Sequence, residues 1–271
     1  MDGFPEGVDT SRPSTARVYD CLLGGTDNFP ADRELFGRLL AVAPECMREA
    51  MANRSFLHRV VRFLAAESGI SQFLDIGSGL PTRGNVHLAA RETGHPGRVV
   101  YVDNDPGVVA HGRALLGNSD EAAMIVGDIR RPQQILASPE VRKLLDPGRP
   151  VALMLLAVLH HVNDDEDPAG ITMVLHSALP PGSYLAISHF RDTSAASPTH
   201  AWSTGATQRI LNEALGSGVF RSQEEILGYF GDLALVEPGL VPLPEWRPAR
   251  SCTRFQHDVD QSFVGGVARK E

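Results

Sequence analysis

The stretch QFLDIGSGLPT at residues 72–82, followed by RVVYVDNDP at residues 98–106, decides how this chain is expected to fold. Residues 73–76 form a short apolar run typical of a buried strand, and Gly77-Ser78-Gly79 provides a tight turn after it. Residues 98–103 form a second apolar run after an intervening helical stretch. Two such strands joined through a helix predict a βαβ unit with parallel strands.

The alternation of strands and helices continues toward the C-terminus and predicts an α/β fold with a doubly wound sheet. Further strands are expected at residues 123–126, 151–156, 184–188, 235–243 and 262–267, and helices at residues 84–92, 106–116, 139–145, 171–179, 204–215 and 222–230. Residues 17–69 show helical spacing only, with Asp32 and Ser55 as expected helix caps. We therefore predict an N-terminal tail and helical cap over residues 1–69 and one α/β domain over residues 70–271.

The composition of the 271-residue chain is that of an ordinary globular protein, with 42% hydrophobic and 21% charged residues. A net charge of −8 argues against general binding of nucleic acid or of anionic membranes, because both demand a basic surface. No apolar run approaches the roughly 18 residues that cross a bilayer, and the N-terminus lacks the order of a signal peptide. Three widely spaced cysteines give neither a zinc motif nor a disulfide framework. We expect a cytoplasmic protein whose ligand is a small molecule or another protein, and no feature predicts its oligomeric state.

Acidic residues follow the predicted strands at the position where a doubly wound sheet binds its ligands. Asp103 ends the second strand, 24 residues after Gly79, and a carboxylate at this distance accepts hydrogen bonds from both ribose hydroxyls of an adenosine ligand. Helix capping is the alternative role for Asp103. After the third strand, Asp128 is placed to accept from an adenine amino group while Ile129 packs on the ring. These strand ends predict an adenosine-containing ligand.

Two adenosine cofactors, NAD and S-adenosylmethionine, fit this description. A dinucleotide-binding loop needs the GxGxxG pattern so that a helix N-terminus meets the pyrophosphate. Here Leu80-Pro81-Thr82 follows Gly79 instead, and Asp75 precedes the glycines. A carboxylate at that turn would repel a pyrophosphate but could organise a cationic sulfonium amino acid. S-adenosylmethionine is therefore the predicted cofactor, and an NAD-dependent oxidoreductase is the weaker alternative.

Several segments together resemble the actinobacterial family of S-adenosylmethionine-dependent methyltransferases with largely unassigned substrates. They are ARVYD (16–20), LLGG (22–25), DNF (27–29), DR (32–33), NR (53–54), DIGSGLPT (75–82), VYVDNDP (100–106), LHHV (159–162), PGSYL (181–185) and EPGLV (237–241). The resemblance covers Arg12 to Lys270. It implies a class I methyltransferase sheet whose last strand is antiparallel, with N-terminal helices that form a lid over the cofactor. The cofactor-binding residues that we expect are Tyr19, Gly24, Gly25, Asn28, Asp75, Gly77, Gly79, Asp103, Asn104, Asp128, Ile129 and Ala157.

The segment from Tyr19 to Asn28 has two interpretations. Its adjacent glycines, Gly24 and Gly25, together with Asn28, could bring backbone and amide groups against a zwitterionic ligand. The same residues could instead form a helix C-cap followed by a turn. The resemblance favours the ligand role.

His160 and His161 follow the fourth strand, where the transferred methyl group should emerge. Either histidine could remove a proton from a substrate hydroxyl or amine, because its ordinary pKa lies near neutral. Positioning and exclusion of water are the alternative to a base. His189, at the end of the fifth strand, is a further candidate. No metal site is predicted, because adjacent helical residues point apart and no HExxH motif accompanies the pair.

These observations predict an enzyme, an S-adenosylmethionine-dependent methyltransferase that acts on an unidentified acceptor, for which we expect a small molecule. A non-catalytic protein that binds S-adenosylmethionine as a sensor or partner module would carry the same cofactor residues.

Overall fold

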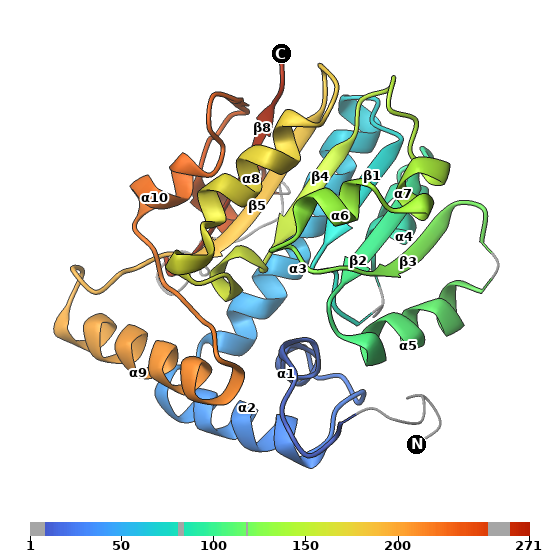
Figure 1. Cartoon of the computed structure of the whole chain (residues 1–271). Coiled ribbons are helices and arrows are strands. Elements are labelled where there is room, and N and C mark those ends of the chain that lie inside the picture. Colours follow the sequence, from blue (N-terminus) through green and yellow to red (C-terminus); the bar gives the residue numbers. More distant parts are fainter. Residues whose placement is uncertain (1–8, 81–83, 118, 249–260) are drawn as a thin grey trace.

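A computed structural model describes residues 9–80, 84–117, 119–248 and 261–271, so Pro81 and Thr82 of the predicted glycine loop lie outside the described residues. Its centre is an eight-stranded sheet with the order β3-β2-β1-β4-β5-β8-β6, in which β7 also pairs with β8 (Figure 1). The strands are β1 (Gln72–Ile76), β2 (Arg98–Asp103), β3 (Ala122–Val126), β4 (Ala152–Leu156), β5 (Tyr184–Phe190), β6 (Ala234–Leu235), β7 (Val241–Pro242) and β8 (Phe263–Arg269). Strands β1 to β5 run parallel, and β8 runs antiparallel to β5. The predicted doubly wound α/β sheet with an antiparallel last strand is confirmed.

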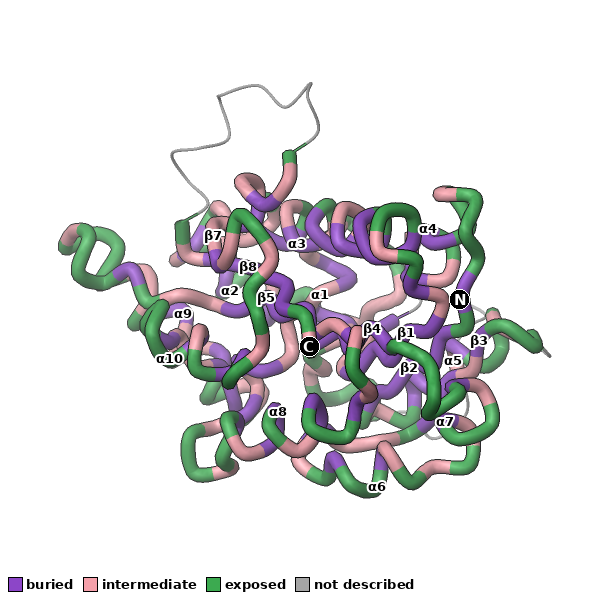
Figure 2. Tube along the Cα trace, turned by 90° about the horizontal axis from the view of Figure 1, so that it is seen from above, coloured by how far each residue is buried: buried purple, intermediate pink, exposed green. Residues whose placement is uncertain are grey.

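The helices form a layer on each face of the sheet and a separate group at the carboxyl ends of the parallel strands. They are α1 (Thr15–Leu22), α2 (Pro30–Val42), α3 (Cys46–Arg62), α4 (Val86–Glu92), α5 (Pro106–Leu116), α6 (Pro132–Leu136), α7 (Pro139–Leu144), α8 (Pro168–Ser177), α9 (Pro198–Leu215) and α10 (Gln223–Gly228). Seen from above, α3 and α4 lie on one side of the strands and α6 and α8 on the other (Figure 2). This three-layer arrangement leaves the carboxyl ends of the parallel strands open toward α1 and α2 (Figure 1).

Two apolar cores hold the layers together. Phe56 and Val60 of α3 pack with Phe73 of β1 on one face of the sheet. On the other face, Leu74 of β1 packs in a cluster that includes Leu175 of α8. Successive strand residues point to opposite faces, and the nearly continuous apolar runs of β1 and β4 therefore supply both cores.

Three helices far apart in the sequence, α1, α2 and α9, form a three-helix cap beneath the strand ends (Figure 1). Its small core joins Val18 of α1, Leu35 and Leu39 of α2, and Leu211 of α9. The predicted boundary after residue 69 stays a prediction. Packing contacts join the two predicted parts, because α3 of the first part packs on the sheet and α9 of the second part packs in the cap.

Several predicted element bounds are wrong. Helix α3 begins at Cys46 rather than at Ser55, and α9 begins at Pro198 rather than at residue 204. The expected strand over residues 235–243 is interrupted, because only Ala234–Leu235 and Val241–Pro242 pair with β8. Asp32 does not precede α2 but lies within its first turn, where its carboxylate accepts from the backbone of Phe29. Helix α6 was not predicted. Within the described ranges, no helix has the length and apolarity required to span a bilayer.

Candidate functional site

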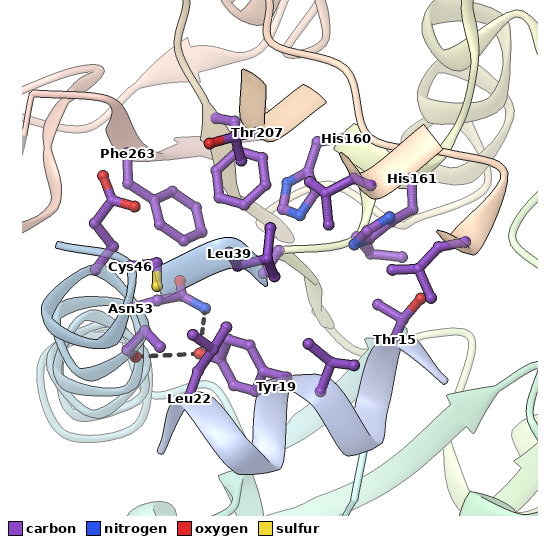
Figure 3. A pocket seen from close by; sticks show the side chains of 18 of the residues that line it. Thr15, Tyr19, Leu22, Leu39, Cys46, Asn53, His160, His161, Thr207 and Phe263 are labelled. Atoms are coloured by element: carbon purple, nitrogen blue, oxygen red, sulfur yellow. Dashed lines mark hydrogen bonds between the residues drawn. The ribbon is translucent and has the colours of Figure 1, made fainter. Parts of the chain in front are cut away.

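A cavity of about 900 Å³ separates the strand ends from the three-helix cap. This is near the upper end of the roughly 300–1,000 Å³ typical of small-molecule sites. Thr15 and Tyr19 of α1 face His160 and His161 across it, and Cys46 and Asn53 of α3 close one side (Figure 3). Most of the predicted site residues line it: Tyr19, Asp75, Gly77, Gly79, Asp103, Asn104, Ile129, Ala157, His160 and His161.

Asp103 ends β2 and holds the glycine turn that follows β1. Its Oδ2 accepts a hydrogen bond of 2.9 Å from the backbone N–H of Gly79, and its Oδ1 accepts one of 3.0 Å from that of Asp105. Burial raises the pKa of Asp103 to about 6. Gly79 has a φ of +67°, and the atom nearest to a Cβ placed there is that of Ala16 at 4.0 Å. The turn therefore leaves open space on the side of the cavity.

A second buried carboxylate, Asp75, lies at the end of β1. Burial raises the pKa of Asp75 to about 7, the charge of Arg54 opposes this change, and the charge of Asp103 adds to it. Two buried carboxylates beside an open glycine turn create a site that a cation would stabilise. The adjacent Ser78 Oγ is buried and has no hydrogen-bond partner among the described residues. These groups fit the charged amino-acid part of S-adenosylmethionine, which brings a cation and further polar atoms.

The ends of β3 and β4 contribute less polar contacts. Ile129 is buried and lines the cavity, whereas Asp128 does not line it. The Asp128 carboxylate accepts instead from the backbone and the guanidinium of Arg130. After β4, Ala157 lines the cavity in the left-handed conformation, with a φ of +55°. Ile129 therefore lies on the cavity wall, where it could contact the adenine, and Asp128 is a hydrogen-bond partner of Arg130.

A chain of hydrogen bonds connects the cap to the end of β4. Tyr19 of α1 accepts from Asn53 Nδ2 at 3.0 Å and donates to the carbonyl of Ala50 (Figure 3). Asn53 Oδ1 accepts from Ser188 Oγ at 2.7 Å, and Ser188 Oγ accepts from the backbone N–H of Ala157 at 2.9 Å. The cap, α3 and two strand ends thus share one polar network. Neither Asn53 nor Ser188 was among the predicted site residues.

Three predicted cofactor residues, Gly24, Gly25 and Asn28, do not line the cavity. Asn28 Nδ2 donates to the Asp20 carboxylate at 2.9 Å, and the Gly25 N–H donates to the Asp20 carbonyl. A Cβ on Gly25 would lie 1.9 Å from the same carboxylate. This loop therefore has the geometry of the alternative interpretation, a helix C-cap followed by a turn, and its glycines permit close packing on Asp20.

Two further contacts hold the N-terminal segment, and the sequence alone does not predict them. Ser14 Oγ donates to Asp105 Oδ2 at 2.8 Å, and Arg17 Nε pairs with Asp32 at 2.8 Å with both side chains buried. The first contact ties the cap to the loop after β2, and the second fixes α1 against α2. Asp105 also accepts from the N–H groups of Gly107 and Val108, as expected of a helix cap.

His160 and His161 lie in the turn after β4 and line the cavity opposite α1 (Figure 3). The His160 ring stacks on Phe190 at 3.8 Å between ring centroids, and its Nδ1 is buried without a hydrogen-bond partner among the described residues. Burial lowers the pKa of His160 well below the ordinary value. His161 Nδ1 lies 3.2 Å from Ser217 Oγ, and burial lowers the pKa of His161 to about 4. Both imidazoles are therefore neutral at pH 7.

Arg221 holds the turn of His160 and His161 from the side away from the cavity. No pattern in the sequence predicts this role. Its guanidinium donates to the carbonyls of Leu159 and Val162 at 3.1 and 2.6 Å, and to Asp164 at 2.8 Å. It also lies 3.0 Å from His189 Nε2. The other nitrogen of His189 donates to the Phe190 carbonyl, so His189 is held within the protein and does not line the cavity.

Among the residues described, no group of histidine, cysteine and acidic side chains has the arrangement of a metal site. The site therefore consists of polar groups at the ends of β1 and β2, a neutral histidine in the turn after β4, and a helical cap that faces both. This combination of sheet order and site defines the class of S-adenosylmethionine-dependent methyltransferases.

The chain belongs to the S-adenosyl methyltransferase family, which it matches over residues 2–271. The structure of a proposed methyltransferase from Thermobifida fusca YX is similar at a TM-score of 0.91 and 44% identity, covering 98% of both chains. A DUF574 family protein from Streptomyces avermitilis MA-4680 is similar at a TM-score of 0.90 and 38% identity, covering 97% of this chain and 99% of that one.

An O-methyltransferase family protein from Burkholderia thailandensis shares the fold alone. Its TM-score is 0.53 and its identity 13%, over 83% of this chain and 60% of that one. The search among curated proteins gave no match. The predicted family, enzyme class and cofactor are confirmed by the family match.

Proposed function

We propose that this chain transfers a methyl group from S-adenosylmethionine to a small-molecule acceptor held in the same cavity. The observation that carries the proposal is the continuity of that cavity from Asp103 and Gly79, under β1 and β2, to His160 opposite the cap. A volume of about 900 Å³ leaves room for an acceptor beside the cofactor.

The cofactor residues are assigned from their places in the cavity. Asp103 accepts hydrogen bonds from the ribose hydroxyls, because its carboxylate is fixed by two backbone N–H groups at the cavity wall. Asp75 and Ser78 bind the amino-acid part, and Ile129 packs on the adenine. Tyr19 covers the cofactor from α1. The loop of Gly24, Gly25 and Asn28 supports α1 and acts on the cofactor only through it.

When bound, S-adenosylmethionine supplies a methyl group that is an electrophile, and its sulfur is the leaving group. The chain aligns the acceptor with that methyl group and excludes water by means of the three-helix cap. His160 accepts the proton that the acceptor loses, because it is neutral and lines the same cavity as Asp103. The free thiols of Cys21 and Cys46 fit the cytoplasmic location that we propose.

The proposal is tested with S-adenosylmethionine that carries a radiolabelled methyl group. Incubation with a fractionated extract of small metabolites is expected to yield a labelled product, and Asp103→Ala is expected to abolish it. A sensor or partner module would bind S-adenosylmethionine with the same residues and yield no product in any fraction. That result would overturn the catalytic role while leaving the cofactor site in place.

A further inference from the structure

The part of the cavity around His160 has an aromatic wall, which consists of His160, Phe190, Phe220 and Phe263. His160 and Phe190 stack at 3.8 Å with 20° between the ring planes, and Phe190 and Phe220 stack at 4.9 Å with 14°. Phe263 lies 4.9 Å from Phe190 in a tilted arrangement. Two strands, β5 and β8, and two connecting segments thus bring four rings to one wall, and such a wall binds a further ring by stacked or edge-to-face contact.

The cap completes this end of the cavity with apolar groups and hydroxyls. Leu39 of α2 and Leu211 of α9 line it, and Thr207 of α9 points toward the wall beside His160 (Figure 3). Trp202 lines the cavity from α9 and keeps 61% of its surface exposed. These side chains fit a ring that is mostly apolar and has few polar substituents.

Three described arginines line the cavity, and two of them act on acidic side chains. Arg54 acts on Asp75, and Arg130 pairs with Glu166 at 2.5 Å. Arg12 enters from the segment before α1. A carboxylate on α3, Glu49, lines the cavity and accepts from Ser262 Oγ. An anionic acceptor at the aromatic wall would therefore compete with Asp75 and Glu166 for Arg54 and Arg130, and burial of its charge without a full cationic partner is costly.

The surroundings of His160 determine which hydroxyl it can deprotonate. Its buried Nδ1 meets no carboxylate among the described residues, so the imidazole lacks the acidic partner that raises basicity in a His–Asp pair. The charge of Arg221 behind the turn and the neighbouring His161 and His189 further disfavour the imidazolium. A base of this kind serves an acceptor whose own hydroxyl is acidic, such as a phenol, and not an aliphatic alcohol.

We propose that the acceptor is an uncharged aromatic molecule with a phenolic hydroxyl, whose ring packs on the aromatic wall and whose hydroxyl donates to His160. This inference rests on the proposed function. As the phenolic oxygen forms its bond to the methyl carbon, the carbon–sulfur bond breaks and its electron pair stays on sulfur. The phenolic proton moves to the imidazole of His160. The products are a methyl ether, S-adenosylhomocysteine and a proton that His160 releases to water.

The inference is tested by calorimetry on the full chain saturated with S-adenosylhomocysteine, whose own binding is measured first. The probes are 2-naphthol, its saturated analogue decahydro-2-naphthol, the anion 2-naphthoate and the amine 2-naphthylamine. We expect 2-naphthol to bind at least about tenfold more tightly than the saturated alcohol and the anion, and to be the methylated probe when S-adenosylmethionine is supplied. Equal or tighter binding of decahydro-2-naphthol or 2-naphthoate, or methylation of the amine in preference to the phenol, would overturn the inference.

Variants of the aromatic wall test where the ring of the acceptor binds. Phe190→Leu and Phe220→Leu are each expected to weaken 2-naphthol binding by about fivefold or more and to leave S-adenosylhomocysteine binding unchanged. Phe36→Leu, on α2 and outside the cavity lining, is the matched control. If both wall variants bind 2-naphthol as the unchanged protein does, the proposed ring site is wrong. Phe220→Leu keeps the test decisive if Phe190→Leu does not fold.

The role of His160 is read from the pH dependence of His160→Gln. At pH 7 we expect this variant to methylate 2-naphthol at least about 100-fold more slowly. The rate should recover as the pH rises and the phenol ionises by itself, and the loss should be smaller for the more acidic 4-nitrophenol. His95→Gln, on an exposed loop, is the matched control. A loss that is the same at every pH and for both phenols would contradict proton transfer to His160.

The binding of S-adenosylhomocysteine distinguishes a failure of the proposed function from a failure of this inference. If S-adenosylhomocysteine does not bind, both are wrong. If it binds and the phenol is not preferred, only the inference is wrong.

Discussion

The hydroxyl of Ser188 on β5 donates a hydrogen bond of 2.7 Å to Oδ1 of Asn53 on α3, across 135 residues of sequence. Each partner makes a second bond on its far side, Asn53 to the hydroxyl of Tyr19 and Ser188 to the backbone N–H of Ala157. The cap is thereby linked to the strand end that opens into the histidine turn. A disturbance at one end of this network should be felt at the other.

Replacing Asn53 tests that link. Asn53→Ala leaves the buried hydroxyl of Ser188 without its acceptor, and we expect a loss of about 1–3 kcal/mol in the free energy of unfolding. Tyr19→Phe removes the tyrosine hydroxyl at the cap end of the network, and with it the hydrogen bonds to Asn53 and to the carbonyl of Ala50. This variant should lose about 1 kcal/mol in the free energy of unfolding. Denaturant titration of both variants measures this. Equal losses for the two variants would show that Ser188 gains nothing from Asn53.

Asp75 is expected to destabilise the protein when no cofactor is bound. Its folded pKa of about 7 lies above the ordinary value of 3.8, so the folded state binds the proton more tightly than the unfolded state. The free energy of unfolding therefore falls as the pH rises from about 4 to 7. Asp75→Asn should raise that free energy by on the order of 2 kcal/mol at pH 8 and leave it nearly unchanged at pH 4.

The same variant should weaken the binding of S-adenosylmethionine, because the cationic part of the cofactor loses a carboxylate. Asp165→Asn, at an exposed position, controls for the change of net charge.

The stability predicted for Asp75→Asn is measured by thermal unfolding at pH 4 and pH 8 without ligand. A variant that is less stable than the unchanged protein at pH 8 would contradict the account of Asp75.

Arg221 is expected to position the histidine turn and not to touch the ligand. Arg221→Gln removes donors from the buried carbonyls of Leu159 and Val162, which should cost about 2–4 kcal/mol of stability. Asp164→Ala should cost less than about 1 kcal/mol, because the Asp164 side chain is 78% exposed. In a methyl-transfer assay Arg221→Gln should lower kcat more than it changes the KM for the cofactor. A pure rise in the cofactor KM would place Arg221 in the cofactor site instead.

Gly79 and Gly94 offer a matched pair of glycines in the left-handed region. Their φ angles are +67° and +79°, and neither position would bring a Cβ closer than 4.0 Å to another atom. Alanine should therefore cost about 1–2 kcal/mol of stability at either position. Only Gly79→Ala should also weaken S-adenosylhomocysteine binding, because only Gly79 lines the cavity. Equal affinity of the two variants would mean that the ligand does not approach the glycine turn.

The part of the fold that could be predicted from sequence is the part that local patterns control. The apolar runs of β1 and β2, and the glycine turn after β1, specify a parallel sheet because each is decided within a few residues. The interrupted strand near residues 234–242 could not be predicted in this way. Its apolar residues pair with β8 in only two short pieces, and that pairing depends on distant chain segments.

The site divides in the same way. Asp103 and Ile129 could be predicted because they lie at or just after the ends of strands, and these ends meet at one edge of the sheet. Arg221 and Asn53 act through buried partners that are far away in the sequence, so no local spacing predicts their contacts, although Asn53 belongs to a segment that resembles the family. Gly25 shows the reverse case, since adjacent glycines fit both a ligand loop and a tight turn. Only the carboxylate of Asp20, packed against Gly25, distinguishes the two.

The central claim is that Asp103 binds the nucleoside of the cofactor, and calorimetry with S-adenosylhomocysteine tests it most directly. Asp103→Asn keeps the size of the side chain but removes the charge that accepts from two hydroxyls, so the affinity should fall by about 50-fold or more. Asp128→Asn is the matched control, because Asp128 itself does not line the cavity and pairs with Arg130, and the affinity of this variant should stay within about threefold of the unchanged protein. Unaltered affinity in Asp103→Asn, or an equal loss in both variants, would contradict the account.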